Sequence, residues 1–183
     1  MRRKTGHKFG FSRQKMIGEL SIIYLLYCAE IENGVFMRIE IRKLQEADIG
    51  ILAQVEAEAF SMPWTEKAFR ELLDHDYCHY LVALADGRPV GCCGYTHICG
   101  EACIDNVVVD RQYRNQGICQ AMLRELIAGA EADGVEAFTL EVRVSNAAAI
   151  HIYEKEGFCS VGIRPGFYEK PREDAMIMWR RNM

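Results

Sequence analysis

The chain has 183 residues, of which half are hydrophobic and 26% are charged, and its formal net charge is −4 at pH 7. This composition, without an internal repeat or a low-complexity tract, is typical of one compact globular domain. The acidic balance argues against a nucleic-acid-binding surface over the whole chain.

The first 36 residues differ from the rest, because they contain six Lys or Arg residues against three Glu. An apolar run at 20–29 follows the basic start, which is the outline of a secretory signal. However, Tyr27 stands where cleavage needs a small residue, and about ten apolar residues are too few to span a bilayer. We interpret residues 1–36 as an extension outside the fold, with Met37 as the natural start of a domain over 37–183. A short amphipathic anchor is the alternative.

From Met37 the apolar pattern predicts strands and helices, beginning with a first strand in MRIEIRKL, where Ile39 and Ile41 alternate with charged neighbours. Two amphipathic helices are expected at 47–60 and 65–75, because Pro63 and its neighbours interrupt the pattern between them. The next elements are strands, with Asp86-Gly87 supplying a hairpin turn between the first two. These strands are predicted at 77–85, 89–98 and 102–109.

The stretch from 104 to 127 reads as strand, loop and helix. The β-branched run 107–109 ends at Asp110, a polar loop leads to Gly117, and apolar residues then recur at helical spacing. Such a junction directs backbone N–H groups and the positive end of the helix dipole at one point, which favours a phosphate group. Neither a Gly-Lys-Ser/Thr nor a Gly-x-Gly-x-x-Gly signature occurs there.

The loop sequence Arg114-x-x-Gly117-x-Cys119 resembles the Arg/Gln-x-x-Gly-x-Gly/Ala loop of the GNAT superfamily, whose members bind acetyl-CoA. Cys119 departs from the Gly or Ala that this superfamily prefers, which bears on the affinity for the cofactor. The resemblance implies acetyl-CoA as co-substrate, with the following cofactor-binding residues: Val107, Val108, Val109, Arg114, Asn115, Gln116, Gly117, Ile118, Cys119, Gln120, Ala121 and Asn146.

After this helix, a strand is predicted at 137–144. Its alternation places Thr139, Glu141 and Arg143 on the face opposite the apolar residues. Ser145-Asn146 caps the next helix, which ends at Gly157. The last strands are expected at 158–163 and 174–179.

This order of elements is that of the GNAT fold: an α/β fold with a mixed, mostly antiparallel sheet of about seven strands and helices on both faces. Three separated segments sharpen the resemblance, namely Pro63-Trp64-Thr65-Glu66-Lys67, LEVRVSNAAAIHIYEKEGF at 140–158 and REDAMIM at 172–178. They are similar to the bacterial ribosomal-protein-alanine N-acetyltransferases. The resemblance implies a protein N-terminal amine as acceptor. The acidic balance, the short apolar run and the cysteines further predict a cytoplasmic protein without direct nucleic-acid binding or stable membrane association.

Acetyl transfer to an amine needs a base and an acid, and the sequence offers one candidate for each. Glu141 is the candidate general base; its alternative is a surface ion pair with Arg143 or another cation. Tyr153 is the candidate general acid, on the helix face shared with Asn146, and its alternative is a core tyrosine. Asn146 either contacts the cofactor or simply caps the helix.

Three aromatic residues are candidates for the acceptor site. Trp64, Phe167 and Tyr168 match positions near the acceptor peptide in the resembling branch, and we place Phe167 and Tyr168 in the loop before the last strand. Trp64 could equally plug the corner between two helices. Acceptors other than an N-terminus stay open, namely a lysine side chain or a small amine, and so does a non-catalytic acyl-CoA-binding module.

The eight cysteines predict neither disulfides nor a metal site. A core of this size needs no covalent crosslinks, and no Cys-x-x-Cys occurs. His97, Cys99 and Cys103 lie near a hairpin and could chelate a metal, but half-buried strand cysteines are the preferred interpretation. We therefore expect reduced thiols and no metal.

Overall fold

The computed structural model describes residues 23–30 and 36–181, so the basic start of the chain lies outside the described residues. The strands and helices follow one another in the order β1 (Ile23–Glu30), β2 (Phe36–Lys43), α1 (Ile49–Ala59), α2 (Glu66–Leu73), β3 (Cys78–Ala85), β4 (Arg88–Ile98), β5 (Glu101–Val109), α3 (Ile118–Ala132), β6 (Ala137–Arg143), α4 (Ala147–Lys155), β7 (Cys159–Glu169) and β8 (Arg172–Arg181).

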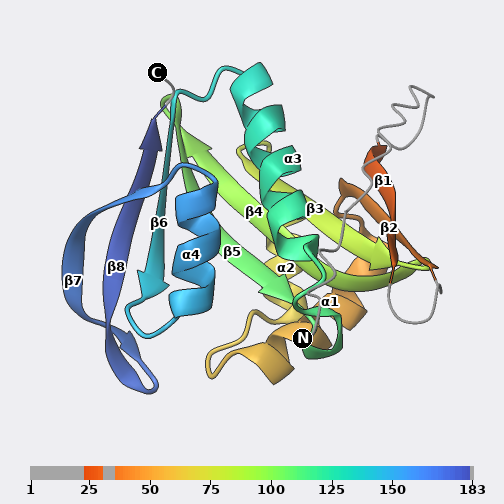
Figure 1. The fold of residues 1–183 in the computed structure, drawn as a ribbon, viewed down its shortest axis with the longest axis horizontal. Coiled ribbons are helices and arrows are strands. Elements are labelled where there is room, and N and C mark those ends of the chain that lie inside the picture. The colour runs from red at the N-terminus through yellow and green to blue at the C-terminus, as the bar shows by residue number, and fades with distance from the viewer. Residues whose placement is uncertain (1–22, 31–35, 182–183) are drawn as a thin grey trace, which may run out of the picture.

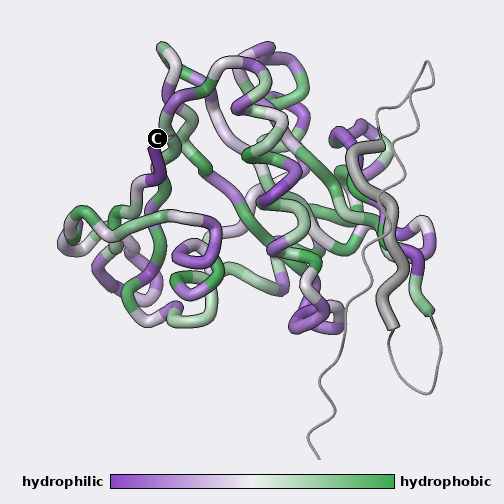
Figure 2. Tube along the Cα trace, turned by 45° about the horizontal axis from the view of Figure 1, so that its top comes forward, coloured by the Kyte–Doolittle hydropathy of each residue, from purple (hydrophilic) through white to green (hydrophobic). Residues whose placement is uncertain are grey.

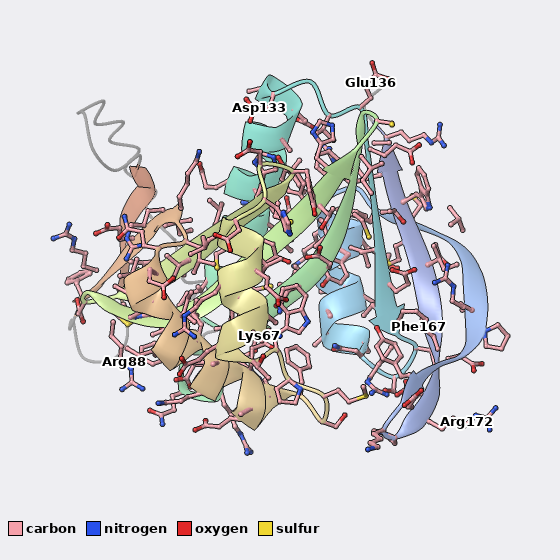
Figure 3. All side chains as sticks on the ribbon, turned by 180° about the vertical axis from the view of Figure 1, so that it is seen from behind. Lys67, Arg88, Asp133, Glu136, Phe167 and Arg172 are labelled. Atoms are coloured by element: carbon pink, nitrogen blue, oxygen red, sulfur yellow. The ribbon has the colours of Figure 1, made fainter. Side chains whose placement is uncertain are left out.

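The strands form one mixed sheet in the order β1-β2-β3-β4-β5-β6-β8-β7. Neighbouring strands are antiparallel except β5 and β6, which are parallel. Helices α3 and α4 cover one face and α1 and α2 cover the other (Figures 1 and 3). The predicted mixed α/β sheet with helices on both faces is therefore confirmed.

The inner strands are buried on both faces, so their side chains supply two hydrophobic cores. In β3, Leu81 and Ala83 pack with the core beneath α3, whereas Val82 and Leu84 pack with the core beneath α1 and α2. This division follows from the alternation of side chains along a strand. The inner strands are accordingly largely hydrophobic and the outer turns largely hydrophilic (Figure 2).

The sheet has one strand more than the seven expected. The predicted strands correspond to β2–β8, and Ile23–Glu30 adds β1 at the edge by antiparallel pairing with β2. Part of the segment assigned to an extension outside the fold thus joins the sheet. That the domain folds from Met37 onward without it stays a prediction.

The last hairpin is longer than predicted, because β7 runs to Glu169 and β8 starts at Arg172. Phe167 and Tyr168 therefore lie in β7 rather than in a loop, which corrects the prediction. The pairing of β7 with β8 shifts register between Arg164 and Tyr168. Pro165 and Gly166 fall in this irregular stretch, and they hide the strand pattern in the sequence.

The carboxyl ends of β5 and β6 diverge, and this divergence creates the space for a site (Figure 1). The two strands pair only from Glu101 opposite Ala137 to Ile104 opposite Leu140, although both continue beyond. On the other side of β5, the register with β4 shifts after Gly94. A Cβ at Gly94 would lie 2.4 Å from ring atoms of Tyr80, so only glycine fits there. Such an irregularity bends a strand away from its neighbour.

Candidate active site

A cleft of about 760 Å³ opens where β5 and β6 diverge. Its walls come from the end of α1 and the loop before α2, the loop before α3, the inner side of α4, and β7. Among the candidate residues, the following line it: Trp64, Val107, Val108, Val109, Arg114, Asn115, Gly117, Ile118, Cys119, Gln120, Glu141, Asn146, Tyr153, Phe167 and Tyr168. Tertiary structure thus brings together residues that are more than one hundred positions apart.

The loop before α3 has the form of an anion-binding junction. Gly117 is the N-cap of α3 with φ 77°, and a Cβ built there would meet no atom within 4 Å. The first N–H groups of a helix have no partner within the helix, so those of α3 are free to bind oxygen atoms in the cleft. Arg114 donates from Nε to the carbonyl of Val109 at 3.0 Å, which holds this arginine at the end of β5.

The open loop fits the pyrophosphate and pantetheine of acetyl-CoA. Its glycine leaves space for a ligand, and β5 beside it presents backbone groups of Val107 to Val109 that are unpaired with β6. Two predicted contacts fall outside the cleft. Ala121 is buried in the core, and the Nε2 of Gln116 donates to the carbonyl of Gln112 at 3.4 Å.

Two further side chains of this region interact with Glu156. The Nε2 of Gln120 donates to Oε1 of Glu156 at 2.6 Å, which ties the first turn of α3 to the end of α4. Burial, and secondarily Glu156, raises the pKa of the Cys119 thiol to about 11. At neutral pH this thiol is therefore uncharged and does not repel a phosphate group.

Glu141 lies on the face of β6 that the alternation predicted, and it lines the cleft. Its Oε1 forms an ion pair with Nη1 of Arg164 at 3.0 Å. The alternative that Glu141 pairs with a cation therefore holds for Arg164, whereas Arg143 binds other groups. Because Arg164 is half exposed, water and salt weaken this pair, and a bound cation can compete with it.

Tyr153 extends from α4 into the wall of the cleft and is 8% exposed. Its ring meets that of Phe158 edge to face, with centroids 5.9 Å apart. Burial raises the pKa of Tyr153, so the phenol keeps its proton across the neutral range. It is thus a core residue whose protonated phenol lines the cleft. Asn146 caps α4, since its Oδ1 accepts the N–H of Ala149 at 3.2 Å, and it also lines the cleft.

Aromatic side chains line the opposite end of the cleft. Trp64 packs against Phe69 and Tyr80, with ring centroids 5.7 and 5.8 Å apart, so it fills the corner between helices and faces the cleft as well. Phe167 and Tyr168 face it from β7. Tyr168 donates its hydroxyl to the backbone carbonyl of Glu141 at 3.2 Å.

A buried polar pair in the cleft wall was missed by the sequence analysis. Glu56, 1% exposed, accepts from Nδ2 of Asn106 at 2.9 Å and from the N–H of Trp64 at 3.3 Å. Burial raises the pKa of Glu56, against the effect of these hydrogen bonds. Two features of the sequence could have revealed this pair. Asn106 is a polar residue within an apolar strand, and Glu56 follows Val55 on the apolar face of α1.

Comparison with known proteins identifies the relatives of this chain. The profile of the acetyltransferase (GNAT) family matches residues 50–158. An Escherichia coli (strain K12) [ribosomal protein bS18]-alanine N-acetyltransferase is 36% identical over 140 residues, which cover 75% of this chain and 94% of that protein.

Solved structures show the same fold. The ribosomal-protein-S18-alanine N-acetyltransferase from Escherichia coli superposes with a TM-score of 0.72 at 34% identity, over 78% of this chain and 93% of that one. The PaiA N-acetyltransferase from Thermoplasma acidophilum in complex with coenzyme A has a TM-score of 0.67 at 19% identity, over 79% and 99%.

Proposed function

This chain belongs to the acetyltransferase (GNAT) family, and from that premise we propose that it acetylates the N-terminal α-amine of a protein with acetyl-CoA. The acceptor we propose is an N-terminal alanine of a ribosomal protein, because a relative of that name is 36% identical along almost its whole length. The observation that carries the proposal is the cleft, in which the open end of α3, a carboxylate and a phenol face one space.

We propose that Glu141 is the general base. An α-amine has a pKa of about 7.7–8.0 and a lysine about 10.4, so an α-amine loses its proton more easily by roughly 3.4 kcal/mol. The acceptor ammonium replaces Arg164 beside the carboxylate and then gives up its proton, directly or through a water molecule. The neutral nitrogen can then attack the acetyl carbonyl carbon.

Tyr153 is the proposed general acid. Acetyl-CoA, when bound, supplies a thioester whose carbon–sulfur bond breaks as the new carbon–nitrogen bond forms. Tyr153, which is protonated at neutral pH, gives its proton to the departing thiolate. The nitrogen loses its second proton as the amide forms, and this proton restores the phenol, whose pKa burial raises. We propose that backbone N–H groups of Val107 to Val109 hold the pantetheine and polarise the carbonyl.

The described residues contain no helix that is both long enough and apolar enough to cross a membrane. Among them there is likewise no group of three or more His, Cys, Asp or Glu side chains placed to hold a metal ion. We propose that the enzyme acts in the cytoplasm, where ribosomal proteins are made.

The test is acetylation of a peptide array in which each sequence occurs with a free and with a blocked N-terminus. We expect transfer to free N-termini only, strongest for those that begin with alanine. Transfer to the lysines of blocked peptides would show a lysine acetyltransferase instead. Acetyl-CoA binding without transfer to any peptide or small amine would show a non-catalytic module.

A further inference from the structure

The β7–β8 hairpin projects beyond the strand that anchors it. Pairing of β6 with β8 ends at Arg143 opposite Ala175, whereas β8 continues down to Arg172. Beyond that point one more backbone hydrogen bond, from the N–H of Val144 to the carbonyl of Asp174 at 3.3 Å, joins β8 to the segment after β6, and the tip is then two-stranded. An isolated two-stranded hairpin is marginally stable. Phe167 and Tyr168 lie in this part of the hairpin and line the acceptor end of the cleft.

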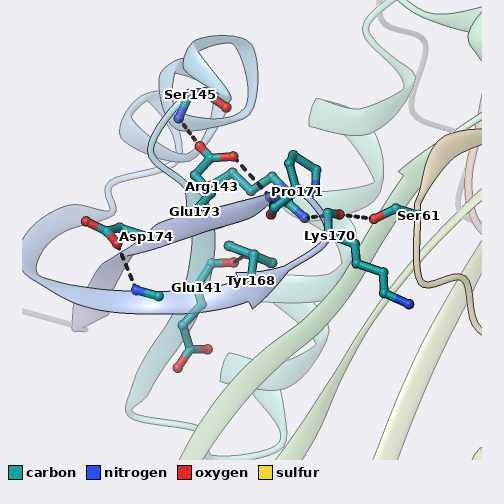
Figure 4. A network of polar contacts seen from close by, with 10 residues as sticks. Ser61, Glu141, Arg143, Ser145, Tyr168, Lys170, Pro171, Glu173 and Asp174 are labelled. Atoms are coloured by element: carbon teal, nitrogen blue, oxygen red, sulfur yellow. Dashed lines mark hydrogen bonds and ion pairs between the residues drawn. The ribbon is translucent and has the colours of Figure 1, made fainter.

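One side chain of β6 holds the tip (Figure 4). Arg143 donates from Nη2 to the carbonyl of Lys170 and from Nη1 to the carbonyl of Pro171, both at 3.0 Å. Its Nη1 also contacts Oε2 of Glu173 at 3.0 Å, and its guanidinium lies 4.1 Å from the centre of the Tyr168 ring. This single planar group therefore contacts both strands of the hairpin and the turn between them.

The partners of Arg143 are themselves fixed by further contacts. The second carboxylate oxygen of Glu173 accepts the N–H of Ser145 at 2.7 Å, and the hydrogen bonds of Ser145, followed by Arg143, lower the pKa of Glu173. The carbonyl of Lys170 also accepts the hydroxyl of Ser61, which lies in the loop before α2. The network thus joins both walls of the acceptor end.

We propose that Arg143 is a positioning residue for the acceptor: it fixes the β7–β8 hairpin so that Phe167 and Tyr168 are held against the cleft. This inference rests on the proposed function. Arg143 has no part in the proposed cofactor site, so its loss is expected to affect binding of the acceptor and not of acetyl-CoA. Lysine cannot replace it, because an ammonium group is a point charge that neither forms the planar fork nor stacks on the ring.

The test compares Arg143→Gln and Arg143→Lys with Arg172→Gln in the full chain. Arg172 is the matched control, because it is an exposed arginine at the tip of the same hairpin (Figure 3), with its guanidinium beside Gly166. Misplacement of about 1 Å can cost a hundredfold in rate. We therefore expect Arg143→Gln to lower kcat/KM for a free N-terminal peptide between about tenfold and a hundredfold. The Kd for CoA and the Tm should stay near those of the control.

Two further measurements separate positioning from general damage. Alanine amide has no peptide chain beyond its first residue to pack against Phe167 and Tyr168, so its kcat/KM should change less in Arg143→Gln than that of the peptide. Arg143→Lys should recover only a small part of the peptide activity. Full recovery by lysine, or equal losses for peptide and alanine amide, would overturn the positioning role.

Hydrogen exchange tests the inference without any acceptor. In Arg143→Gln the amides of residues 166–174 should exchange faster than in the control, while those of α3 and β4 stay protected. Unchanged exchange in the hairpin would overturn the proposal. If the wild-type protein acetylates lysines and not N-termini, the proposed function fails, and the exchange result still decides the role of Arg143.

Discussion

Glu141 and Tyr153 reach the same cleft from different surroundings, and these surroundings suit different roles. Glu141 is on a sheet face beside an exposed arginine, where an ammonium ion can approach it. Tyr153 lies on α4 and is buried against the core, and this burial keeps the phenol neutral. A base that meets a cation and an acid that stays protonated are what acetyl transfer to an amine requires.

Variants of these two residues should respond differently to pH. Glu141→Gln keeps the shape and loses the basicity, so turnover should fall by about 10²–10⁴. Higher pH should partly restore it, because more of the acceptor amine is then already neutral. Tyr153→Phe should not be restored, since no phenol is left to protonate the thiolate. The pH–rate profiles of both variants provide the check, and parallel losses at every pH would contradict this division of roles.

The buried Glu56 should make stability depend on pH. Burial raises its pKa in the folded state above the ordinary value of 4.5, so the folded chain keeps a proton that the unfolded chain has lost. The contribution is fully present below pH 4.5 and is lost as pH rises through the folded-state pKa. Glu56→Gln can still accept from Asn106, and it should flatten this slope. Denaturant unfolding of both proteins at several pH values measures the slope, and identical slopes would show that another group titrates.

At the scale of elements, the proposed binding at the junction of β5 and α3 depends on the backbone rather than on side chains. Gly117 has a positive φ and open space beside it. It directly precedes the first turn of α3, whose N–H groups have no partner within the helix. The arrangement is encoded within a few neighbouring residues. It follows that its function can be removed by one local substitution without loss of the fold.

Gly117→Glu should abolish retention on CoA resin, because it places a carboxylate where the pyrophosphate is proposed to bind. Gly134→Glu is the matched control: Gly134 also has a positive φ, of 89°, and open space, but it follows the other end of α3. Both variants carry a similar backbone strain of about 1–3 kcal/mol. The circular dichroism spectra of both should stay close to that of the parent protein. Equal CoA retention by both would contradict the assignment of this loop.

At the scale of the whole molecule, the sheet is wider than the part that makes the site. The cleft is lined by residues of α1 and of the elements from β5 to β7, whereas β1 pairs with β2 at the far edge of the sheet. The two cores lie on either side of the inner strands, and β2 contributes Met37, Ile39 and Ile41 to one of them. The described strand before Met37, β1, therefore lies at the edge of the sheet away from the cleft.

Deletion of residues 1–36 should leave Tm and acetyl transfer close to those of the full chain. The physical reason is that β2 keeps its pairing with β3 and its buried side chains. Deletion of residues 1–22 is the control, because it removes what precedes β1 and keeps the strand. A large loss of Tm in the longer deletion alone would show that β1 is an essential part of the domain.

The features that the sequence determined by itself are those that depend on residues close together along the chain. Apolar periodicity predicted the strand, loop and helix around Gly117 and the face of β6 that carries Glu141, and the structure confirms both. The helix cap at Asn146 and the turn at Asp86-Gly87 followed from the preferences of single residues. The family also followed from short contiguous segments, and the comparisons confirm it.

Only the tertiary structure decided how these parts meet. The divergence of β5 and β6 depends on register shifts, and hydrophobic alternation does not reveal a shift. The pairing of Glu56 with Asn106 joins positions fifty apart, and the choice of Arg164 over Arg143 as the partner of Glu141 depends on where the β7–β8 hairpin folds back. Such contacts arise from the packing of whole elements, and that packing is not encoded in any stretch short enough to be read along the chain.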